Sequence, residues 1–378
     1  MSRMELAGRL KRAREAVGLS LGDAATRLGF PNYQTLSNIE KGEREVKASE
    51  LALFAKTYFC NLNSLLLGDD QPPPEVHFLW RRAPAERKSE VEAFIRHKFE
   101  EYHLLEKLLG LTEEGTGLTL SVSPADVRNN YQVDALATRV GDLLNLGSRP
   151  ALSLQKVMEQ ILRTKLLFVE LSDFGSAAAT VHPEFGAAIV INNAEAPWRI
   201  NFTLAHELFH ILTWSTFNPA GLEQDEALFK DVENKAERFA STLLLPESAV
   251  REELNTRVKE QKLSFSDIVD ISREFGVSTP AMLYRMANLK LIAWEKANAL
   301  AQSDGLKKID QRARKDMDHD SPTSQRFMLL AVKCLRKGLI SRGKFSELLD
   351  IDRADIDEHL EYWGLSEEEG ESIEIMAT

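Results

Sequence analysis

The sequence predicts a mainly α-helical fold with a small β-sheet. Through most of the 378 residues, apolar side chains recur at three- and four-residue spacing, which is typical of amphipathic helices. Strand-like runs are few, the clearest being Leu166–Leu171 and Ala187–Asn192. The proline triplet at 72–74 cannot continue a helix, so it marks a boundary between a small head and the rest of the chain.

Composition narrows the class of protein. Hydrophobic residues make up 43% and charged residues 28% of the chain, which excludes disordered, collagen-like and disulfide-scaffold proteins. The apolar runs are too short to cross a bilayer and the first residues lack a signal peptide, so we expect a cytoplasmic protein without membrane contact. Cys60 and Cys334 lie in apolar helical patterns and are expected to be buried free thiols.

The formal net charge of −11 argues against DNA as a partner of the whole chain. The charge is, however, unevenly distributed along the sequence. Residues 1–70 carry ten basic and nine acidic side chains, whereas residues 361–378 carry six glutamates and no base. The head is therefore near neutral. Any DNA binding by the head is expected to be weaker, and more dependent on dimerisation, than in a basic regulator.

Four segments are expected along the chain. After the head come the proline linker and an amphipathic helix from Ser89 to Leu109, then a Gly/Thr/Ser-rich stretch, Leu111–Ser123, and a helix from Asp126 to Leu146 that closes at Gly147. The expected boundaries are 1–70 for the head, 71–124 for the linker and bracing helix, 125–292 for a mixed α and β core, and 293–378 for a helical extension with an acidic tail.

The head contains two helices with a specific layout. The first begins after Ser20 as its N-cap and ends at Gly29. The second, Tyr33–Lys41, turns Leu36 and Ile39 inward. Gln and Asn can pair with adenine edges, and Ser, Thr and Tyr can contact bases or phosphates, so the free face predicts a major-groove helix. The residues on or near that face are Tyr33, Gln34, Thr35, Ser37 and Asn38.

The whole string from Leu10 to Leu66 resembles the XRE/Cro helix-turn-helix family, including its Ile39-Glu40-Lys41-Gly42 ending of the second helix. The resemblance implies DNA binding through residues 1–70, with a homodimer supplying the second half-site. Leu21 stands where the family usually has Gln, so modest affinity is expected. The alternative is that the head recognises another protein.

The segment with the clearest metal-binding and catalytic pattern is His206-Glu207-x-x-His210. On a helix the two histidines lie one turn apart on one face, so both imidazoles can reach one metal ion, and Glu207 projects beside them toward the water that the metal activates. This is the HExxH pattern. The alternative is two structural histidines on an ordinary helix.

A catalytic zinc needs a third protein ligand from another element. Glu233 is the expected ligand, because it lies in a second helical stretch whose small residues would allow close packing against the first. Glu237, one turn later on the same face, is its main competitor. Asp225 and Glu226 are expected to be loop carboxylates.

The segments Ala187–Ile211 and Glu233–Pro246 resemble the ImmA/IrrE family of zinc metallopeptidases. The family pattern is a strand ending in Asn, then FTLAHELGH, then E-x-x-A-x-x-F-A-x-x-L-L-x-P. The resemblance implies an α+β zincin-like metallopeptidase core that binds Zn²⁺, with Mn²⁺ as the alternative ion. It also implies these roles: His206, His210 and Glu233 as metal ligands and Glu207 as general base.

Two positions depart from that pattern. Phe209 stands where Gly is usual and is expected to crowd the substrate groove, and Glu237 stands where Asn is usual and would add a carboxylate near the metal. The strand Ala187–Ile191 is expected to be the sheet edge along which an extended substrate pairs. His182 and Arg199 are the nearest candidates in sequence to support the site, although a hairpin histidine is more often structural.

These residues support peptide hydrolysis by water, in which zinc lowers the pKa of the water to about 7 and Glu207 passes its proton to the leaving amine. The resemblance implies a specific protein substrate, a repressor-type DNA-binding regulator whose cleavage switches on stress or mobile-element genes. The alternative is a non-cleaving transcriptional regulator whose peptidase-like domain senses a ligand or metal. The unit from Gly338 to Leu349 resembles the helical extension common in this peptidase group, and its acidic surroundings favour protein interaction.

Overall fold

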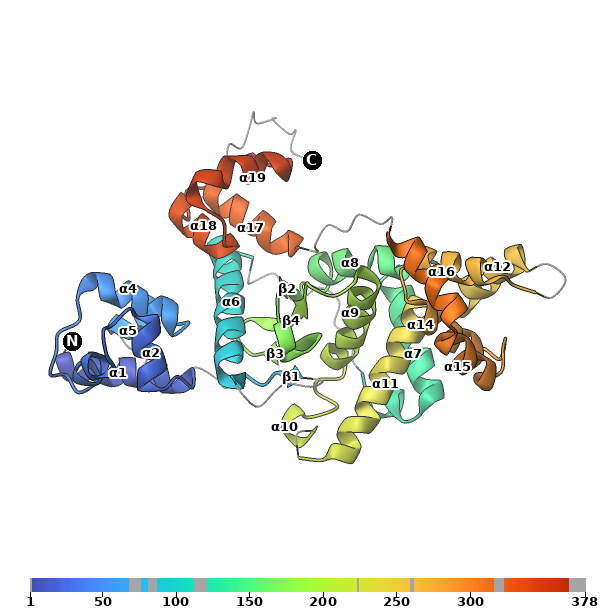
Figure 1. The fold of residues 1–378 in the computed structure, drawn as a ribbon, viewed down its shortest axis with the longest axis horizontal. Coiled ribbons are helices and arrows are strands. Elements are labelled where there is room, and N and C mark those ends of the chain that lie inside the picture. Colours follow the sequence, from blue (N-terminus) through green and yellow to red (C-terminus); the bar gives the residue numbers. More distant parts are fainter. Residues whose placement is uncertain are drawn as a thin grey trace, which may run out of the picture. The chain divides into compact units, whose positions relative to one another are not determined.

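The structure is a computed structural model that describes residues 2–67, 76–80, 87–111, 120, 122–222, 224–258, 262–315 and 323–366. The proline triplet at 72–74, most of the stretch Leu111–Ser123 and the end of the acidic tail lie outside these residues. The chain divides into two compact units, one formed by Met1–Val76 and Arg82–Leu104 and the other by His77–Arg81 and Leu105–Thr378. Helices dominate both units and the sheet is small, so the predicted fold class is confirmed (Figure 1).

The first unit is helical throughout its described residues. Ser20 caps its second helix by accepting a hydrogen bond from Asp23 N at 3.1 Å, and Gly29 follows that helix with a φ of +70°. Leu36 and Ile39 are 0% and 1% exposed, so the predicted inward face of the third helix is confirmed. The helices are α1 (Arg3–Ala16), α2 (Leu21–Arg27), α3 (Tyr33–Glu40), α4 (Ala48–Thr57), α5 (Leu62–Leu67) and α6 (Lys88–Leu108), of which α6 continues into the second unit.

The second unit contains a four-stranded sheet in the order β1-β3-β4-β2. The strands are β1 (Leu79–Trp80), β2 (Lys165–Val169), β3 (Ala177–His182) and β4 (Gly186–Asn192). β2 and β4 match the two predicted runs and pair in parallel, whereas β3 pairs antiparallel with both β4 and β1. The sequence prediction missed β1 and β3, because β1 has two residues and β3 begins with three alanines, which have low strand propensity.

One expectation about the sheet is wrong. The strand Ala187–Ile191 belongs to β4, which has β3 on one side and β2 on the other, so its backbone groups are already paired along both edges. Among the described strands, the outer edges belong to β1 and β2.

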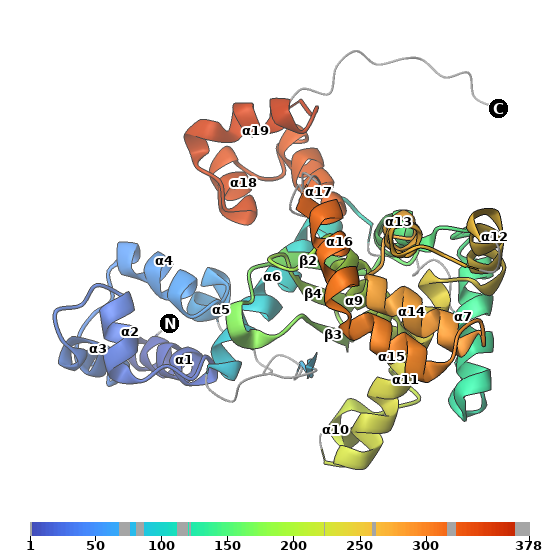
Figure 2. The same cartoon turned by 45° about the vertical axis from the view of Figure 1, so that its right-hand side comes forward.

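Helices pack against this sheet in successive layers. α9 (Pro197–Leu212) lies against β3 and β4, α11 (Glu226–Leu244) packs on α9, and α7 (Asn130–Leu143) packs on α11 (Figures 1 and 2). The helix predicted at Asp126–Leu146 is present in two parts, the 3₁₀ turn η1 (Pro124–Val127) and α7. Asn129 caps α7.

The remaining helices complete the second unit. Ser324 and Ser341 occupy the N-cap positions of the helices Gln325–Arg336 and Arg342–Leu349, and Cys334 is buried in the first of these. Cys60 of the first unit is half-buried, and both cysteines are free. These helices are α8 (Leu154–Gln160), α10 (Pro219–Leu222), α12 (Glu247–Arg257), α13 (Phe265–Glu274), α14 (Thr279–Asn288), α15 (Trp294–Gln302), α16 (Asp304–Lys315), α17 (Gln325–Arg336), α18 (Arg342–Leu349) and α19 (Ile356–Tyr362). Three 3₁₀ turns, η2 (Pro150–Leu152), η3 (Ser172–Phe174) and η4 (Arg353–Asp355), are also described.

Candidate metal centre

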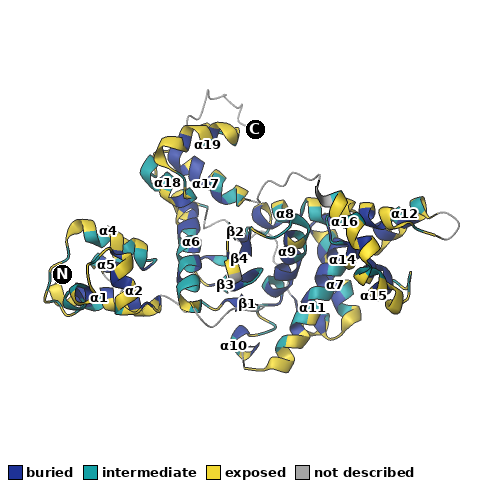
Figure 3. Ribbon diagram, in the orientation of Figure 1, coloured by how far each residue is buried: buried dark blue, intermediate teal, exposed yellow. Residues whose placement is uncertain are grey.

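The helix that carries the HExxH pattern is buried over most of its length. Pro197 occupies the first turn of α9, where its missing N–H costs no helical hydrogen bond. All residues from Thr203 to His210 are buried, and Figure 3 shows the helix dark blue between the sheet and its neighbours. His206, Glu207 and His210 are 3%, 4% and 5% exposed. Polar side chains this deeply buried need partners or a ligand, so the core position of this pattern is itself informative.

The helix α11 brings a carboxylate to the same place. It begins after Asp225, whose Oδ1 accepts a hydrogen bond from Leu228 N at 3.0 Å, and Glu226 is exposed in its first turn. Both acids are therefore at the start of α11 rather than in a loop. Ala236 and Ala240 are fully buried, and their small side chains allow α11 to approach α9 closely.

Three side chains converge where α9 and α11 meet. The Nε2 atoms of His206 and His210 lie 3.2 Å apart. Glu233 reaches both, with 3.4 Å from Oε2 to His206 Nε2 and 3.1 Å from Oε1 to His210 Nε2. Among the described residues, this is the set of three or more His, Cys, Asp or Glu side chains whose ligand atoms lie close enough to hold one ion. Glu237, half-buried one turn later, is not a member of the set.

The donor set fits a zinc ion. Bonds of 2.0–2.1 Å in a tetrahedral site place neighbouring ligand atoms about 3.3 Å apart, and the three observed separations, 3.2, 3.4 and 3.1 Å, lie around that value. Two imidazole nitrogens and one carboxylate are also the ligands of catalytic sites that keep a fourth position open.

The surroundings favour an ionised Glu233. Burial alone would raise its pKa, but hydrogen bonds and charges from His206 and His210 outweigh burial and hold the pKa of this carboxyl well below its usual range. A carboxylate that is ionised is ready to bind a cation.

The two departures from the family pattern have clear positions. Phe209 is 0% exposed and packs in the core against Phe239 of α11, with ring centroids 5.5 Å apart. It therefore fills the space between two helices, which corrects the expectation that it crowds a groove. Glu237 remains on α11 beside the ligand-bearing turn without joining the triad.

The two supporting candidates have structural contacts. His182 ends β3, where its Nδ1 accepts a hydrogen bond from Glu184 N at 3.3 Å and its ring stacks on Phe185. Arg199 is exposed on the first turn of α9, and its Nε lies 3.0 Å from Glu195 Oε1. These contacts hold the hairpin and the start of α9.

Sequence reasoning missed residues that position α9. Asn192 ends β4 and its Oδ1 accepts a hydrogen bond from Ala194 N at 3.1 Å, while its Nδ2 donates to Gly175 O at 3.3 Å. Asn201 Nδ2 donates to Gly276 O at 2.9 Å and so ties α9 to the turn after α13. The two asparagines flank the pattern in the sequence, and a side-chain amide at a strand end is the signal that could have found Asn192.

The second candidate site is the free face of α3. Tyr33 is 58% exposed and Gln34 is also exposed, and Gln34 Nε2 donates to Asn38 Oδ1 at 3.0 Å. Thr35 is half-buried and donates to the capping Asn32, and Ser37 and Asn38 are half-buried. The structure therefore presents Tyr33, Gln34 and Asn38 together along one side of the helix.

No described helix is both long enough and apolar enough to span a membrane.

Two family models match the regions that contain the candidate sites. A family model described as an IrrE N-terminal-like domain, of peptidase family M78, matches residues 161–287, which include the metal triad. A model described as a helix-turn-helix domain matches residues 5–60, which include α3. No curated protein matches the chain.

One similar solved structure is a Mycobacterium tuberculosis transcriptional regulator. It is 17% identical, with 50% of this chain and 51% of that chain covered, and the TM-score is 0.32. The chain thus spans about half of the length of that structure. By these family models, residues 5–60 are similar to a helix-turn-helix domain and residues 161–287 to an IrrE N-terminal-like, metallopeptidase-like domain.

Proposed function

We propose that this protein is a zinc-dependent endopeptidase coupled to a DNA-binding domain. It cleaves a specific protein, a repressor-type DNA-binding regulator, and so switches gene expression in a stress or mobile-element response. The observation that carries the proposal is the triad of His206, His210 and Glu233, whose donor separations of 3.1 to 3.4 Å fit zinc, with Glu207 buried beside it.

In the proposed peptide hydrolysis, the zinc ion and the side chain of Glu207 have separate roles. Zinc, when bound, supplies a Lewis acid that polarises the scissile carbonyl and makes water a better nucleophile near neutral pH. Glu207 follows His206 on α9, accepts the proton of the attacking water and delivers it to the leaving amine. Because Glu207 is 4% exposed, bulk water does not compete for that proton.

The DNA-binding half of the proposal rests on α3. The exposed Tyr33 and Gln34 and the half-buried Asn38 would read base edges in the major groove, and the half-buried Thr35 and Ser37 would contact the backbone. The near-neutral charge of the head favours binding as a homodimer, in which two helices engage two half-sites.

A second function is favoured by one observation. His206, His210 and Glu207 are 3%, 5% and 4% exposed, and β4 has no free edge for an extended substrate. This arrangement supports a regulator that senses zinc or another ligand through the peptidase-like domain without cutting.

A single co-expression experiment separates the two functions. The wild type, Glu207→Gln and the matched control Glu237→Gln are each produced with the repressor encoded nearby, and repressor cleavage and bound zinc are measured. The peptidase predicts cleavage by the wild type and by Glu237→Gln, and no cleavage but retained zinc for Glu207→Gln. An intact repressor with a zinc-loaded wild type would support sensing instead, and cleavage by Glu207→Gln would refute the role of Glu207 as base.

A further inference from the structure

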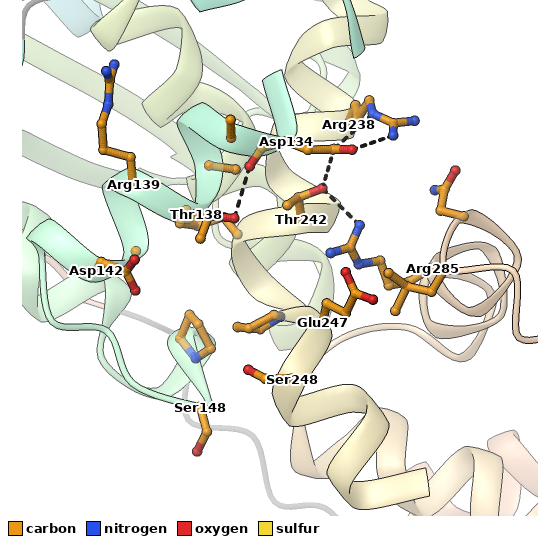
Figure 4. Close-up of a pocket in the computed structure, with 18 of the residues that line it drawn as sticks. Asp134, Thr138, Arg139, Asp142, Ser148, Arg238, Thr242, Glu247, Ser248 and Arg285 are labelled. Atoms are coloured by element: carbon orange, nitrogen blue, oxygen red, sulfur yellow. Dashed lines mark hydrogen bonds and ion pairs between the residues drawn. The ribbon is translucent and has the colours of Figure 1, made fainter. Parts of the chain in front are cut away.

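The second unit contains a large cavity away from the metal triad. Its volume is about 1450 Å³, and it is walled by α7 and the loop after it, by the second half of α11, by the start of α12 and by the end of α14 (Figure 4). Glu233 and Thr242 both lie on α11, and their spacing at 3.6 residues per turn places them on opposite faces of the helix. The helix therefore separates the cavity, which Thr242 lines, from the triad, which Glu233 completes.

The walls of this cavity are positively charged, although the whole chain carries a net charge of −11. Cationic side chains outnumber carboxylates among the lining residues. The cations are Arg139, Arg238, Arg251, Arg285 and Lys290, and the carboxylates are Asp134, Asp142 and Glu247. An acidic protein that gathers cations around one cavity concentrates an attraction for anions there.

Several of these arginines already have carboxylate partners. Arg238 forms an ion pair with Asp134, with Nε donating to Oδ1 at 2.9 Å. Arg251 Nε lies 2.8 Å from Glu247 Oε1, and Arg139 Nη2 lies 3.2 Å from Asp126. These pairs hold the walls in place and neutralise their own charges.

Arg285 is different, because its guanidinium is buried and forms no ion pair with any described carboxylate. It is 5% exposed, and no described carboxylate lies within 4.0 Å of it. Its Nε donates to Leu245 O at 2.9 Å and its Nη1 donates to Thr242 Oγ1 at 3.1 Å, so both of these acceptors are uncharged. Burial lowers the pKa of Arg285, yet an arginine stays protonated in proteins. The carboxylates of Asp134 and Glu247 act on this cation without forming an ion pair with it, and the cavity leaves room for a closer counter-charge.

A helix N-terminus adds further donors. Pro246 is the N-cap of α12, and no side chain caps the helix, so its first N–H groups are not bonded by a cap. Pro246, Glu247 and Ser248 line the cavity, and Figure 4 shows Ser248 on the wall opposite Ser148 and Asp142. Such N–H groups and the helix dipole favour anions.

We infer that this cavity binds a small organic anion through a phosphate or carboxylate group, with Arg285 as the buried counter-charge and the start of α12 as a second donor. A guanidinium fork and helical N–H groups match the oxygens of both groups. The cavity is large enough for a metabolite-sized ligand. The site uses none of the triad residues, so it stands independently of the proposed peptidase activity.

The test measures anion binding to the full-length protein. Inorganic phosphate and succinate are each titrated by calorimetry, and their effect on thermal unfolding is compared with sodium chloride at equal ionic strength. Saturable binding of phosphate or of succinate is expected, with a rise in Tm beyond the chloride control. The oxyanion that binds identifies the preferred group.

Two matched pairs of variants locate the binding. Ser248→Asp places a carboxylate in the cavity, at an exposed position in the first turn of α12 where Asp is well tolerated. It should weaken anion binding about tenfold or more. Ser248→Asn introduces an uncharged side chain of the same shape as Asp and should leave binding unchanged. Arg251→Gln leaves the carboxylate of Glu247 unpaired at the cavity wall and should also weaken binding. Arg257→Gln, on the same helix but paired with Glu253 and Glu274 outside the cavity, should not. The inference would be overturned if neither phosphate nor succinate bound saturably, or if Ser248→Asp bound the anion as tightly as the wild type.

Discussion

Arg14 of α1 and Glu40 of α3 form a doubly hydrogen-bonded ion pair inside the first unit. Arg14 Nε donates to Glu40 Oε1 at 2.7 Å and Nη2 donates to Oε2 at 3.0 Å. The two side chains are 10% and 5% exposed, and Arg14 Nη1 also donates to Leu19 O at 2.7 Å. The pair therefore links the start of the DNA-binding motif to the last residue of α3.

Glu40→Ala is expected to destabilise the first unit by about 3 kcal/mol, because it leaves the buried Arg14 cation with only the exposed Glu15, 3.6 Å away, as its counter-charge. The double variant Arg14→Met, Glu40→Leu should lose less, since neither charge remains. Chemical denaturation with hydrogen exchange of the first unit measures both. Glu45→Ala removes the exposed partner of Arg3 and should cost less than about 1 kcal/mol, and a loss equal to that of Glu40→Ala would contradict the argument.

Gln34→Ala and Asn38→Ala are expected to weaken binding to the protein's own upstream DNA by about 1–3 kcal/mol each, because each removes a side chain that can bond a base edge. The salt dependence of binding should stay the same, since no phosphate contact is lost. A mobility-shift titration at several salt concentrations measures both quantities. Asn63→Ala, an exposed position on α5, serves as the control. Absence of salt-sensitive binding by the wild type would instead favour a protein as the partner of this domain.

Glu233→Ala should abolish tight zinc binding, whereas Glu237→Ala should retain it, because the triad contains Glu233 and not Glu237. Zinc is expected to raise the Tm of the wild type, since an ion at 100 times its Kd stabilises the folded state by about 2.7 kcal/mol. A chelator should reverse the shift. Calorimetry and thermal unfolding provide the readouts, and equal zinc affinity in the two variants would show that Glu233 is not the third ligand.

Gly276→Ala should destabilise the second unit by more than Gly147→Ala. Both glycines have a left-handed backbone, with φ of +64° and +70°, so both substitutions incur a strain of about 1–2 kcal/mol. An added Cβ at Gly276 would also lie 2.9 Å from Ala151 Cβ and 3.0 Å from Asn201 Nδ2, whereas at Gly147 it meets nothing within 4 Å. Thermal unfolding of the two variants compares them directly. Equal losses would mean that the contact with α9 relaxes without cost.

Glu159 should make the second unit less stable as pH rises. It is 2% exposed, and burial raises the pKa of its carboxyl to about 7 although Arg326 and Gln155 oppose the rise. The folded state therefore favours the protonated form, so the penalty is absent below about pH 4.5, grows toward pH 7 and is complete above it.

Glu159→Gln is accordingly expected to stabilise the protein by up to about 3 kcal/mol at pH 8 and to change little at pH 5. Unfolding curves at the two pH values measure the difference. Glu252→Gln, at an exposed position on α12, should show no pH-dependent gain. A stabilisation of the same size at both pH values would point to packing rather than to ionisation.

Local signals explain what the sequence could predict. The N-cap of Ser20, the left-handed Gly29 and the inward Leu36 of the head depend on neighbours a few residues away, and all three are present. The HExxH helix is equally local. The sequence favoured Glu233 and left Glu237 as its competitor, because both lie on one face of α11 and only the packing of two helices decides which carboxylate reaches the histidines.

Long-range pairing explains what the sequence could not predict. The alanines that begin β3 form a strand because β4 and β1 offer hydrogen bonds on both sides, and no local pattern records that. The same pairing covers the edge that was expected to be free on β4. The charged cavity is also non-local, since Arg238 and Arg285 come from different helices and meet only after the second unit folds.

The position of the short strand β1 in the sequence limits how the two units can be separated by proteolysis. Residues 77–81 belong to the second unit, although the chain on both sides of them, 1–76 and 82–104, belongs to the first. No single backbone cut can therefore release an intact second unit. A proteolytic fragment that starts at residue 105 would lack β1 and leave the outer edge of β3 with unpaired N–H and C=O groups, which is a template for aggregation. Removal of the DNA-binding head by proteolysis would thus also alter the sheet that supports the metal-binding helix.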